Sequence, residues 1–168
     1  MAACQRDPRG AVPAALSSGW DDVLIQLLST PGVSENDVIK TLCMASAAGQ
    51  GGAVRSILSI FPNAARTCDT TKDNVTALHY ASTREVALLL MRSGASPVSE
   101  LNSSGARPIH TASSAGHVEV VRCLLEPASV NQQTRVTGDT PLSVACAAGR
   151  LPVVRMLVNI GADLRISN

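Results

Sequence analysis

Two stretches near the C-terminal end decide the fold: "RPIHTASSAGHVEVVRCLL" at 107–125 and "TPLSVACAAGRLPVVRMLV" at 140–158. They align without a gap at an offset of 33 residues, so that Gly116 falls on Gly149. Apolar, small and glycine positions recur in the same order along both stretches. A period of this length is typical of chains that stack one supersecondary unit on the next.

Three further stretches follow the same template. The stretches at 40–58 ("KTLCMASAAGQGGAVRSIL") and 10–28 ("GAVPAALSSGWDDVLIQLL") fit directly, whereas 76–97 ("TALHYASTREVALLLMRSGASP") fits only when three residues are skipped. The sequence therefore predicts five units, with starts spaced 30, 36, 31 and 33 residues apart. We expect residues 1–10 to be disordered, ahead of one domain over 11–168. We place the units at 11–33, 34–70, 71–101, 102–134 and 135–168.

Each unit is predicted to be a pair of helices. In unit 4 a glycine, Gly116, ends the first helix, because glycine readily adopts the positive φ that follows a last helical turn. The second helix carries Val120, Val121, Leu124 and Leu125 on one apolar stripe. A single pair cannot bury both helices, so the units must stack to form a continuous core.

The composition limits the possible functions. The 168 residues carry a formal charge of +1 and are 45% apolar but only 2% aromatic. An aliphatic core of packed helices is indicated, and the basic stripe of a nucleic-acid-binding protein is missing from the sequence. The longest apolar runs, such as "VALLLM" at 86–91, are too short to span a bilayer. We expect a monomer of the cytoplasm or nucleus, with no nucleic-acid or membrane partner.

The two C-terminal stretches resemble the ankyrin repeat. Its pattern of Gly-x-Thr-Pro-Leu-His-x-Ala-Ala-x-x-Gly-His, Val-Val-x-x-Leu-Leu and Gly-Ala-Asp is matched by "GDTPLSVACAAGRLPVVRMLVNIGAD" (138–163). The stretch "GARPIHTASSAGHVEVVRCLL" (105–125) matches it too. The resemblance covers roughly residues 10–166. It implies an all-α solenoid of antiparallel helix pairs, with β-turn fingers that connect the units and that bind other proteins together with the first helices.

Two units depart from the family pattern. Unit 2 lacks a glycine-containing finger, but Ser34 followed by Asp37 resembles a capping box, so its first helix is predicted to begin near residue 35 and to be long. Unit 3 lacks three residues at the turn, so its first helix is predicted to end near Ser82, about a turn early. In unit 1 Pro13 takes the histidine position, and in unit 4 Pro127 is expected to end the second helix.

Catalytic and metal chemistry is weakly supported. His79 and His110 occupy equivalent positions, too far apart to share zinc easily, and the family pattern implies that this histidine braces the finger. The five cysteines are scattered without a CxxC, and we expect Cys43 and Cys146 to be buried. The loop "GQGGA" (49–53) lacks the Gly-Lys-Ser/Thr of a phosphate cradle. We predict no catalytic residues, no metal and no cofactor.

The family pattern implies where a protein partner binds. The residue after the histidine position points into the concave groove, and Tyr80 is the best single anchor because an aromatic ring with a hydroxyl gives contact area at low entropic cost. The lone tryptophan, Trp20, is either a second anchor or a cover for the end of the array. The predicted groove residues are Met44, Tyr80, Thr111 and Val144, and the predicted finger residues are Lys72, Asp73, Val75, Ser103, Ser104, Val136, Thr137 and Asp139.

We therefore expect a non-catalytic protein-interaction module. Such a module acts as an adaptor or stoichiometric chaperone of the gankyrin kind, or as an inhibitor similar to the ankyrin-type inhibitors of cyclin-dependent kinases. A docking piece of a larger multidomain protein is a further alternative. A thiol- or metal-dependent enzyme is the rival from another class, and clustering of cysteines and histidines in one pocket would support it.

Overall fold

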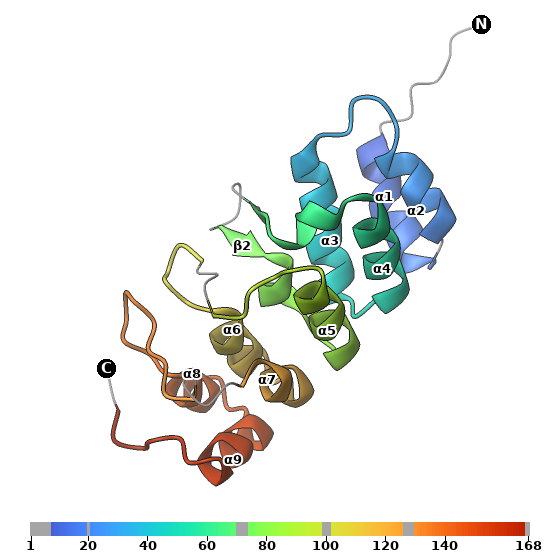
Figure 1. Cartoon of the computed structure of the whole chain (residues 1–168). Helices are drawn as coiled ribbons and strands as arrows, with labels where there is room; N and C mark the ends of the chain where they lie inside the picture. The colour runs from blue at the N-terminus through green and yellow to red at the C-terminus, as the bar shows by residue number, and fades with distance from the viewer. Residues whose placement is uncertain (1–7, 20, 70–73, 99–101, 126–129, 167–168) are drawn as a thin grey trace, which may run out of the picture.

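The computed structural model describes residues 8–19, 21–69, 74–98, 102–125 and 130–166. Within them the chain is mostly helical, and helices follow one another in pairs from α1 at one end of the stack to α9 at the other (Figure 1). Trp20, Pro127, Lys72 and Asp73 lie outside the described residues. The pairs are α1 (Pro8–Ser17) with α2 (Asp21–Leu28), α3 (Glu35–Ala47) with α4 (Gly51–Ile60), the short 3-10 helix η2 (Ala77–Tyr80) with α5 (Arg84–Arg92), α6 (Pro108–Ala115) with α7 (Val118–Leu124), and α8 (Pro141–Ala147) with α9 (Leu151–Asn159).

The helices form two layers. In one layer α1, α3, η2, α6 and α8 pack consecutively, and in the other α2, α4, α5, α7 and α9 do the same. A second 3-10 helix, η1 (Pro62–Ala65), follows α4, and β1 (Cys68–Asp69) pairs antiparallel with β2 (Val75–Thr76) at the base of the unit 3 finger. Within the described residues, connectors at 102–106 and 134–140 take the finger positions of units 4 and 5.

One column of aliphatic side chains runs through the first-helix layer. Leu42, Leu78, Ile109 and Leu142 occupy the same position in units 2 to 5, and each is at most 5% exposed. Burying an aliphatic side chain of this size contributes about 1.5–3 kcal/mol. Each member is covered by at least one neighbouring unit, so the column couples the units.

The N-terminal helix begins earlier than predicted. Residues 8–10, expected to be disordered, belong to α1, so that expectation is corrected for them. Pro8 takes the first helical position, where its fixed φ suits a helix and its missing N–H is not needed. Val12, Ala15 and Leu16 then give the helix a buried face. Residues 1–7 lie outside the described part of the chain.

The long first helix of unit 2 is confirmed. Helix α3 begins at Glu35 and has 13 residues, against 8 in α6 and 7 in α8. Its capping box is complete: Asp37 N donates to Ser34 Oγ at 3.2 Å, and Ser34 N donates to Asp37 Oδ2 at 3.1 Å. These bonds satisfy backbone donors that a helix start leaves without partners, so the helix extends where the other units have a finger.

Unit 3 has the shortened first helix that the deletion predicts, but in a tighter form. The segment is a 3-10 helix that ends at Tyr80, two residues before the predicted end at Ser82. Ser82 then links the shortened segment to α3, because its N and its Oγ both donate to the Ser46 carbonyl, at 3.2 and 3.1 Å. Thr83 caps the following helix α5, which begins at Arg84, because Val86 N donates to Thr83 Oγ1 at 3.4 Å.

The prediction for Cys146 was wrong, although Cys43 is buried as expected. Cys146 aligns with Ser46 and Ser113, both of which are 0% exposed because the next unit covers them. Within the described residues no further helix packs onto α8 and α9, so Cys146 is exposed. The alignment identified the correct position in the unit, and the missing neighbour decided the exposure.

The fingers of units 4 and 5 approach each other at Gly105. This residue has a φ of +71°, and a Cβ there would lie 2.9 Å from the Arg135 backbone nitrogen. Arg135 N also donates to the Gly105 carbonyl at 3.4 Å. Gly149 has a similar φ of +68°, but nothing lies within 4 Å of its Cβ position.

Removing the cap of α3 should destabilise the fold. We expect Ser34→Ala to lower the free energy of unfolding by about 1 kcal/mol, because the Asp37 N–H loses its acceptor. Urea denaturation followed by circular dichroism measures this change. Ser29→Ala, at an exposed serine five residues earlier, is the matched control and should change stability by less than about 0.5 kcal/mol. Equal effects of the two substitutions would contradict the cap.

A second comparison measures the contact between fingers. Gly149→Ala should cost about 1 kcal/mol, the penalty for a Cβ at positive φ. Gly105→Ala should cost at least about 1 kcal/mol more, because its Cβ also meets the Arg135 backbone. Urea denaturation of both variants checks the difference, and equal costs would mean that the two fingers do not need this close approach.

Candidate protein-binding face

His79 joins the first helix of unit 3 to the finger of unit 4. Its Nδ1 accepts a hydrogen bond from Thr76 N at 3.2 Å, and Thr76 Oγ1 lies 2.9 Å from the same atom. Its Nε2 lies 3.1 Å from the Ala106 carbonyl. Nδ1 is thus the acceptor, and the neutral ring carries its proton on Nε2, which donates to Ala106. The bracing role predicted for this histidine is confirmed, and it extends to the next finger.

His110 repeats the arrangement one unit later. Arg107 N donates to its Nδ1 at 3.1 Å, and its Nε2 lies 2.7 Å from the Gln132 carbonyl. In both histidines the two ring nitrogens are therefore occupied by bonds within the chain. Among the described residues, no group of three or more His, Cys, Asp and Glu side chains could hold a metal ion. The histidines fix the positions of the fingers.

Burial keeps His79 neutral. It lowers the pKa of the imidazole from 6.5 to about 4, the bond to the Ala106 carbonyl opposes this shift, and the nearby His110 adds to it. The pKa of His110 is also lowered, again chiefly by burial. A proton on Nδ1 would place a second donor against the Thr76 N–H, so the bracing geometry requires the neutral ring.

Acid should therefore weaken the fold through His79. Between pH 6.5 and about 4 the unfolded imidazole binds a proton that the folded one does not, so the free energy of unfolding falls as pH falls through this window. The loss from this residue is at most about 3.4 kcal/mol, because the pKa is lowered from 6.5 to about 4 and each pKa unit corresponds to about 1.36 kcal/mol. Urea denaturation at pH 7 and pH 5 should show a smaller pH effect for His79→Gln than for the wild type. An equal effect in both would contradict the assignment.

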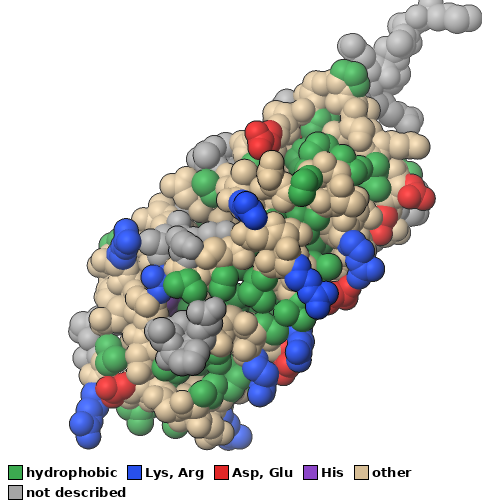
Figure 2. All heavy atoms as spheres, viewed as in Figure 1, with side chains coloured by type: hydrophobic (Ala, Val, Ile, Leu, Met, Phe, Trp, Pro, Cys, Tyr) green, Lys and Arg blue, Asp and Glu red, His purple; other side chains and the backbone are tan. Residues whose placement is uncertain are grey.

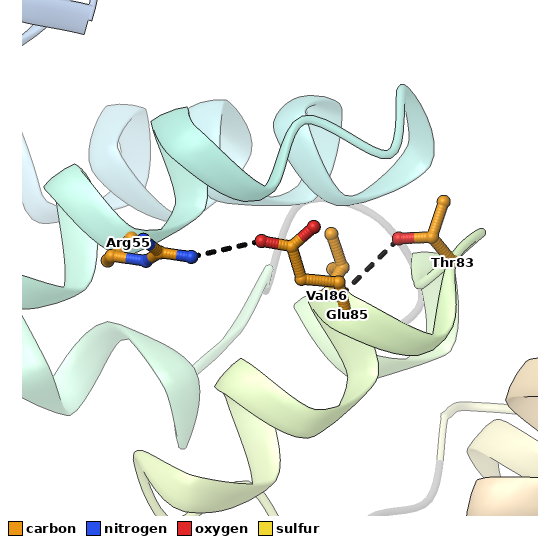
Figure 3. A network of polar contacts seen from close by, with 4 residues as sticks. All are labelled: Arg55, Thr83, Glu85 and Val86. Atoms are coloured by element: carbon orange, nitrogen blue, oxygen red, sulfur yellow. Dashed lines mark hydrogen bonds and ion pairs between the residues drawn. The ribbon is translucent and has the colours of Figure 1, made fainter.

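The glycine-rich stretch at 49–53 was predicted to be a loop, but α4 begins at Gly51, and the helical glycines allow close packing between units. A Cβ on Gly51 would lie 2.5 Å from Glu85 Oε1, and one on Gly52 would lie 2.7 Å from Asp21 Oδ2. Glu85 also pairs with Arg55 at 3.0 Å (Figure 3). Two carboxylates from neighbouring units thus lie at the N-terminus of α4, where they complement the helix dipole and would repel a phosphate.

Charges of both signs line the second-helix layer. Figure 2 shows Lys and Arg side chains interspersed with Asp and Glu along the edge where α4, α5 and α7 lie. Glu119 and Arg122 of α7 form an exposed pair at 3.7 Å, as Arg55 and Glu85 do between α4 and α5. Exposed pairs of this kind contribute about 0–1 kcal/mol. The edge offers no stripe of a single sign for a nucleic acid.

The predicted groove residues differ in what they offer a partner. Met44 is 45% exposed and Tyr80 is 37% exposed. Thr111 and Val144 are half-buried, and the Thr111 hydroxyl lies 2.9 Å from both the His79 and the Pro108 carbonyl oxygens. Its single proton is used inside the chain, so Thr111 links units 3 and 4. The exposed apolar area of the groove is concentrated at Met44 and Tyr80.

The predicted finger residues also differ in how exposed they are. Val136 is 70% exposed, whereas Val75 is half-buried in the β1–β2 pair. Ser103 and Ser104 are exposed on the unit 4 finger, and Thr137 is exposed and bonded to the half-buried Asp139 on the unit 5 finger. Lys72 and Asp73 lie outside the described residues.

The side chain that shapes the unit 4 finger, Asn102, was not predicted from the sequence. Asn102 Oδ1 accepts from Ser104 N at 3.1 Å, from Ser104 Oγ at 2.7 Å and from Ala106 N at 2.8 Å. An asparagine two residues before a turn residue was the available signal, because asparagine side chains bond the backbone two residues on. In unit 5 the Thr134 side chain plays the corresponding role, because its Oγ1 accepts a hydrogen bond from Asp139 N at 2.9 Å.

Two of the cavities beside the loop between α2 and α3 were not predicted from the sequence. One, of about 170 Å³, lies between α1 and α3 and includes Met44 in its lining. The other, of about 330 Å³, lies between the start of α3 and the end of α4, beside Phe61. Both cavities lie beside the connector at 29–34, where unit 2 has no glycine-containing finger.

Comparison with known proteins identifies the family. A family model described as "Ankyrin repeats (3 copies)" matches residues 84–168, just over half of the chain. The chain belongs to the ankyrin-repeat family. Ankyrin repeats are typically non-catalytic modules that bind other proteins. Within the matched range, the His110 brace, the helix pairs α6–α7 and α8–α9, and the turn glycines are the structural counterparts of the pattern.

A probable serine/threonine-protein kinase of Dictyostelium discoideum is similar to this ankyrin-repeat chain. The two are 39% identical over 87 residues, which cover 49% of this chain and 10% of that kinase. The chain thus spans about a tenth of the length of this relative. In the described part of the chain, no helix has both the length and the apolar character needed to cross a membrane.

Proposed function

We propose that this ankyrin-repeat solenoid is a non-catalytic adaptor that holds a protein partner against the first helices and finger tips. The observation that carries the proposal is the exposure of Met44 and Tyr80. They occupy equivalent positions in adjacent units, and among described first-helix residues they are the exposed large hydrophobic ones. An aromatic ring and a flexible thioether are side chains that protein interfaces favour.

The shortened first helix of unit 3 is a second argument for binding at the first-helix face. Its first-helix segment stops at Tyr80, whereas α3 on one side continues to Ala47 and α6 on the other to Ala115. Ala47, Ala48, Ser114 and Ala115 are exposed and small, so they leave room beside the Tyr80 ring. A partner segment can therefore approach the ring closely. Polar finger tips such as Ser103, Ser104 and Thr137 would then contribute the hydrogen-bonding rim of the interface.

A second role, as the docking part of a longer protein, is favoured by one observation. The similar kinase carries its matching stretch as about a tenth of its length, so in that protein the stretch accompanies much other sequence. The chaperone and inhibitor roles use the same face as the adaptor and differ in what happens to the bound partner.

Substitution of the two exposed groove residues tests the proposal. The full chain, immobilised, captures partners that mass spectrometry identifies, and calorimetry with the purified partner gives Kd. We expect Tyr80→Ala and Met44→Ala each to raise Kd by about tenfold or more, since truncating an interface anchor costs at least about 1.4 kcal/mol. Val158→Ala, at a 40% exposed position on α9, is the matched control and should leave Kd unchanged.

Circular dichroism and urea denaturation first establish that each variant is folded. If both groove variants bind the purified partner as tightly as the wild type does, the groove is not the binding face. If Val158→Ala weakens binding while the groove variants do not, the partner binds the second helices instead.

A further inference from the structure

A cavity lies between α1 and α3, at the α1 end of the stack. Its lining comes from three elements: Val12 and Pro13 of α1, Leu28 and Val33 around the connector at 29–34, and Lys40 and Met44 of α3. We name it the α1–α3 pocket. Apart from the polar atoms at its rim, which Asp37, Lys40 and Thr41 supply, its walls are aliphatic or thioether side chains.

The pocket exists because unit 2 departs from the other units. Pro108, the first residue of α6, aligns with Thr41 at the offset of 67, so α3 begins six residues earlier, at Glu35. Asp37 and Lys40 lie on this additional segment. Asp37, Lys40, Thr41 and Met44 follow the spacing i, i+3, i+4, i+7, which places them on one face of the helix. That face lines the pocket.

The volume suits one apolar side chain. The cavity measures about 170 Å³. An apolar cavity of about 150 Å³ in another protein takes up benzene, so this one has room for a side chain of the size of Leu, Met or Phe. Filling such a space removes apolar surface from water on both sides of the contact.

The pocket lining carries one charge of each sign, Asp37 and Lys40, and they differ in whether the side chain has a partner. The Asp37 carboxylate is already bonded, since its Oδ2 accepts from Ser34 N at 3.1 Å and from Ser34 Oγ at 2.7 Å. Among the described residues, the Lys40 ammonium has neither a hydrogen-bond partner nor an ion-pair partner. An ammonium beside an apolar pocket favours a ligand that carries a carboxylate next to its apolar group.

We propose that the α1–α3 pocket binds a peptide segment of a protein partner in which a Leu, Met or Phe side chain is flanked by Asp or Glu. The apolar side chain fills the pocket, and the acidic residue pairs with Lys40. This deepens the proposed function and rests on it, because Met44 belongs both to the pocket and to the groove that leads to Tyr80. The pocket is thus the end of the same binding surface.

A phage-displayed library of random peptides, selected on the immobilised full chain, is the probe. We expect enriched peptides to share an apolar residue next to an acidic one. In a synthetic copy, replacing that apolar residue by Ala should raise Kd about tenfold or more, a measurement that needs no protein variant. Amide NMR signals of Lys40, Thr41 and Met44 should shift when the peptide is added.

A charge reversal tests the rim. Lys40→Glu should raise Kd for the acidic peptide about tenfold or more, and selection on this variant should enrich Lys or Arg beside the apolar residue. Arg155→Glu, which also replaces a positive charge by a negative one, at an exposed residue of α9, is the control. It should leave both Kd and the selected sequences unchanged. Circular dichroism establishes that both variants are folded.

Several results would overturn the pocket assignment. They are a selection that yields no binder, peptides without an acidic residue beside the apolar one, and unchanged binding to Lys40→Glu. Peptides rich in Lys or Arg whose signals shift at Phe61 would place the site in the larger cavity, beside Glu35. Binding that appears only after residues 1–7 are removed would mean that the chain's own N-terminus occupies the pocket.

The two proposals fail in different ways. Peptides lost on Tyr80→Ala, but with no shifts at Lys40, would overturn the pocket and leave the groove as the binding face. Peptide binding that depends on Lys40, combined with a captured partner indifferent to Tyr80→Ala and Met44→Ala, would keep the pocket and overturn the groove.

Discussion

Each helix pair in this protein can bury its aliphatic side chains only against the next pair. Leu42, Leu78, Ile109 and Leu142 are buried because a neighbouring unit covers each of them. Cys146 shows what happens without that cover: its counterparts Ser46 and Ser113 are fully buried, and it is exposed. Every other feature of the fold therefore depends on this stacking, because the fingers, the groove and the pocket are each formed by residues of neighbouring units.

Stacking also explains why a deletion and an extension are both tolerated. Unit 3 retains Leu78 and His79 while losing a turn, and Ser82 supplies new hydrogen bonds to the end of α3. Unit 2 keeps Leu42 in the core while its first helix extends from the Ser34 cap. Both changes preserve the buried column and alter the exposed surface. The surface features that distinguish this chain from a regular array therefore lie at units 1 to 3.

The apolar part of the proposed binding surface lies outside the half of the chain that the family model matches. The ankyrin pattern is matched over 84–168, whereas Met44, Tyr80 and the α1–α3 pocket precede that range. The matched half shows the regular braces of the fold, such as the bond from His110 to the Gln132 carbonyl. Departures from the pattern cannot be interpreted by comparison with the family alone, and they require the contacts of this particular chain.

The sequence by itself determined the repeat, the helix pairs and the cap at Ser34, because each depends on residues close in the chain or at a constant period. The bracing role of the histidines was implied by the resemblance to the ankyrin pattern. The sequence also located the shortened helix of unit 3, although the end at Tyr80 and the 3-10 geometry came from the structure. Only the tertiary structure decided the exposure of Cys146, the carboxylates at the start of α4 and the α1–α3 pocket. These depend on which side chains of different units meet, and no local pattern in the sequence encodes the presence or absence of a neighbour.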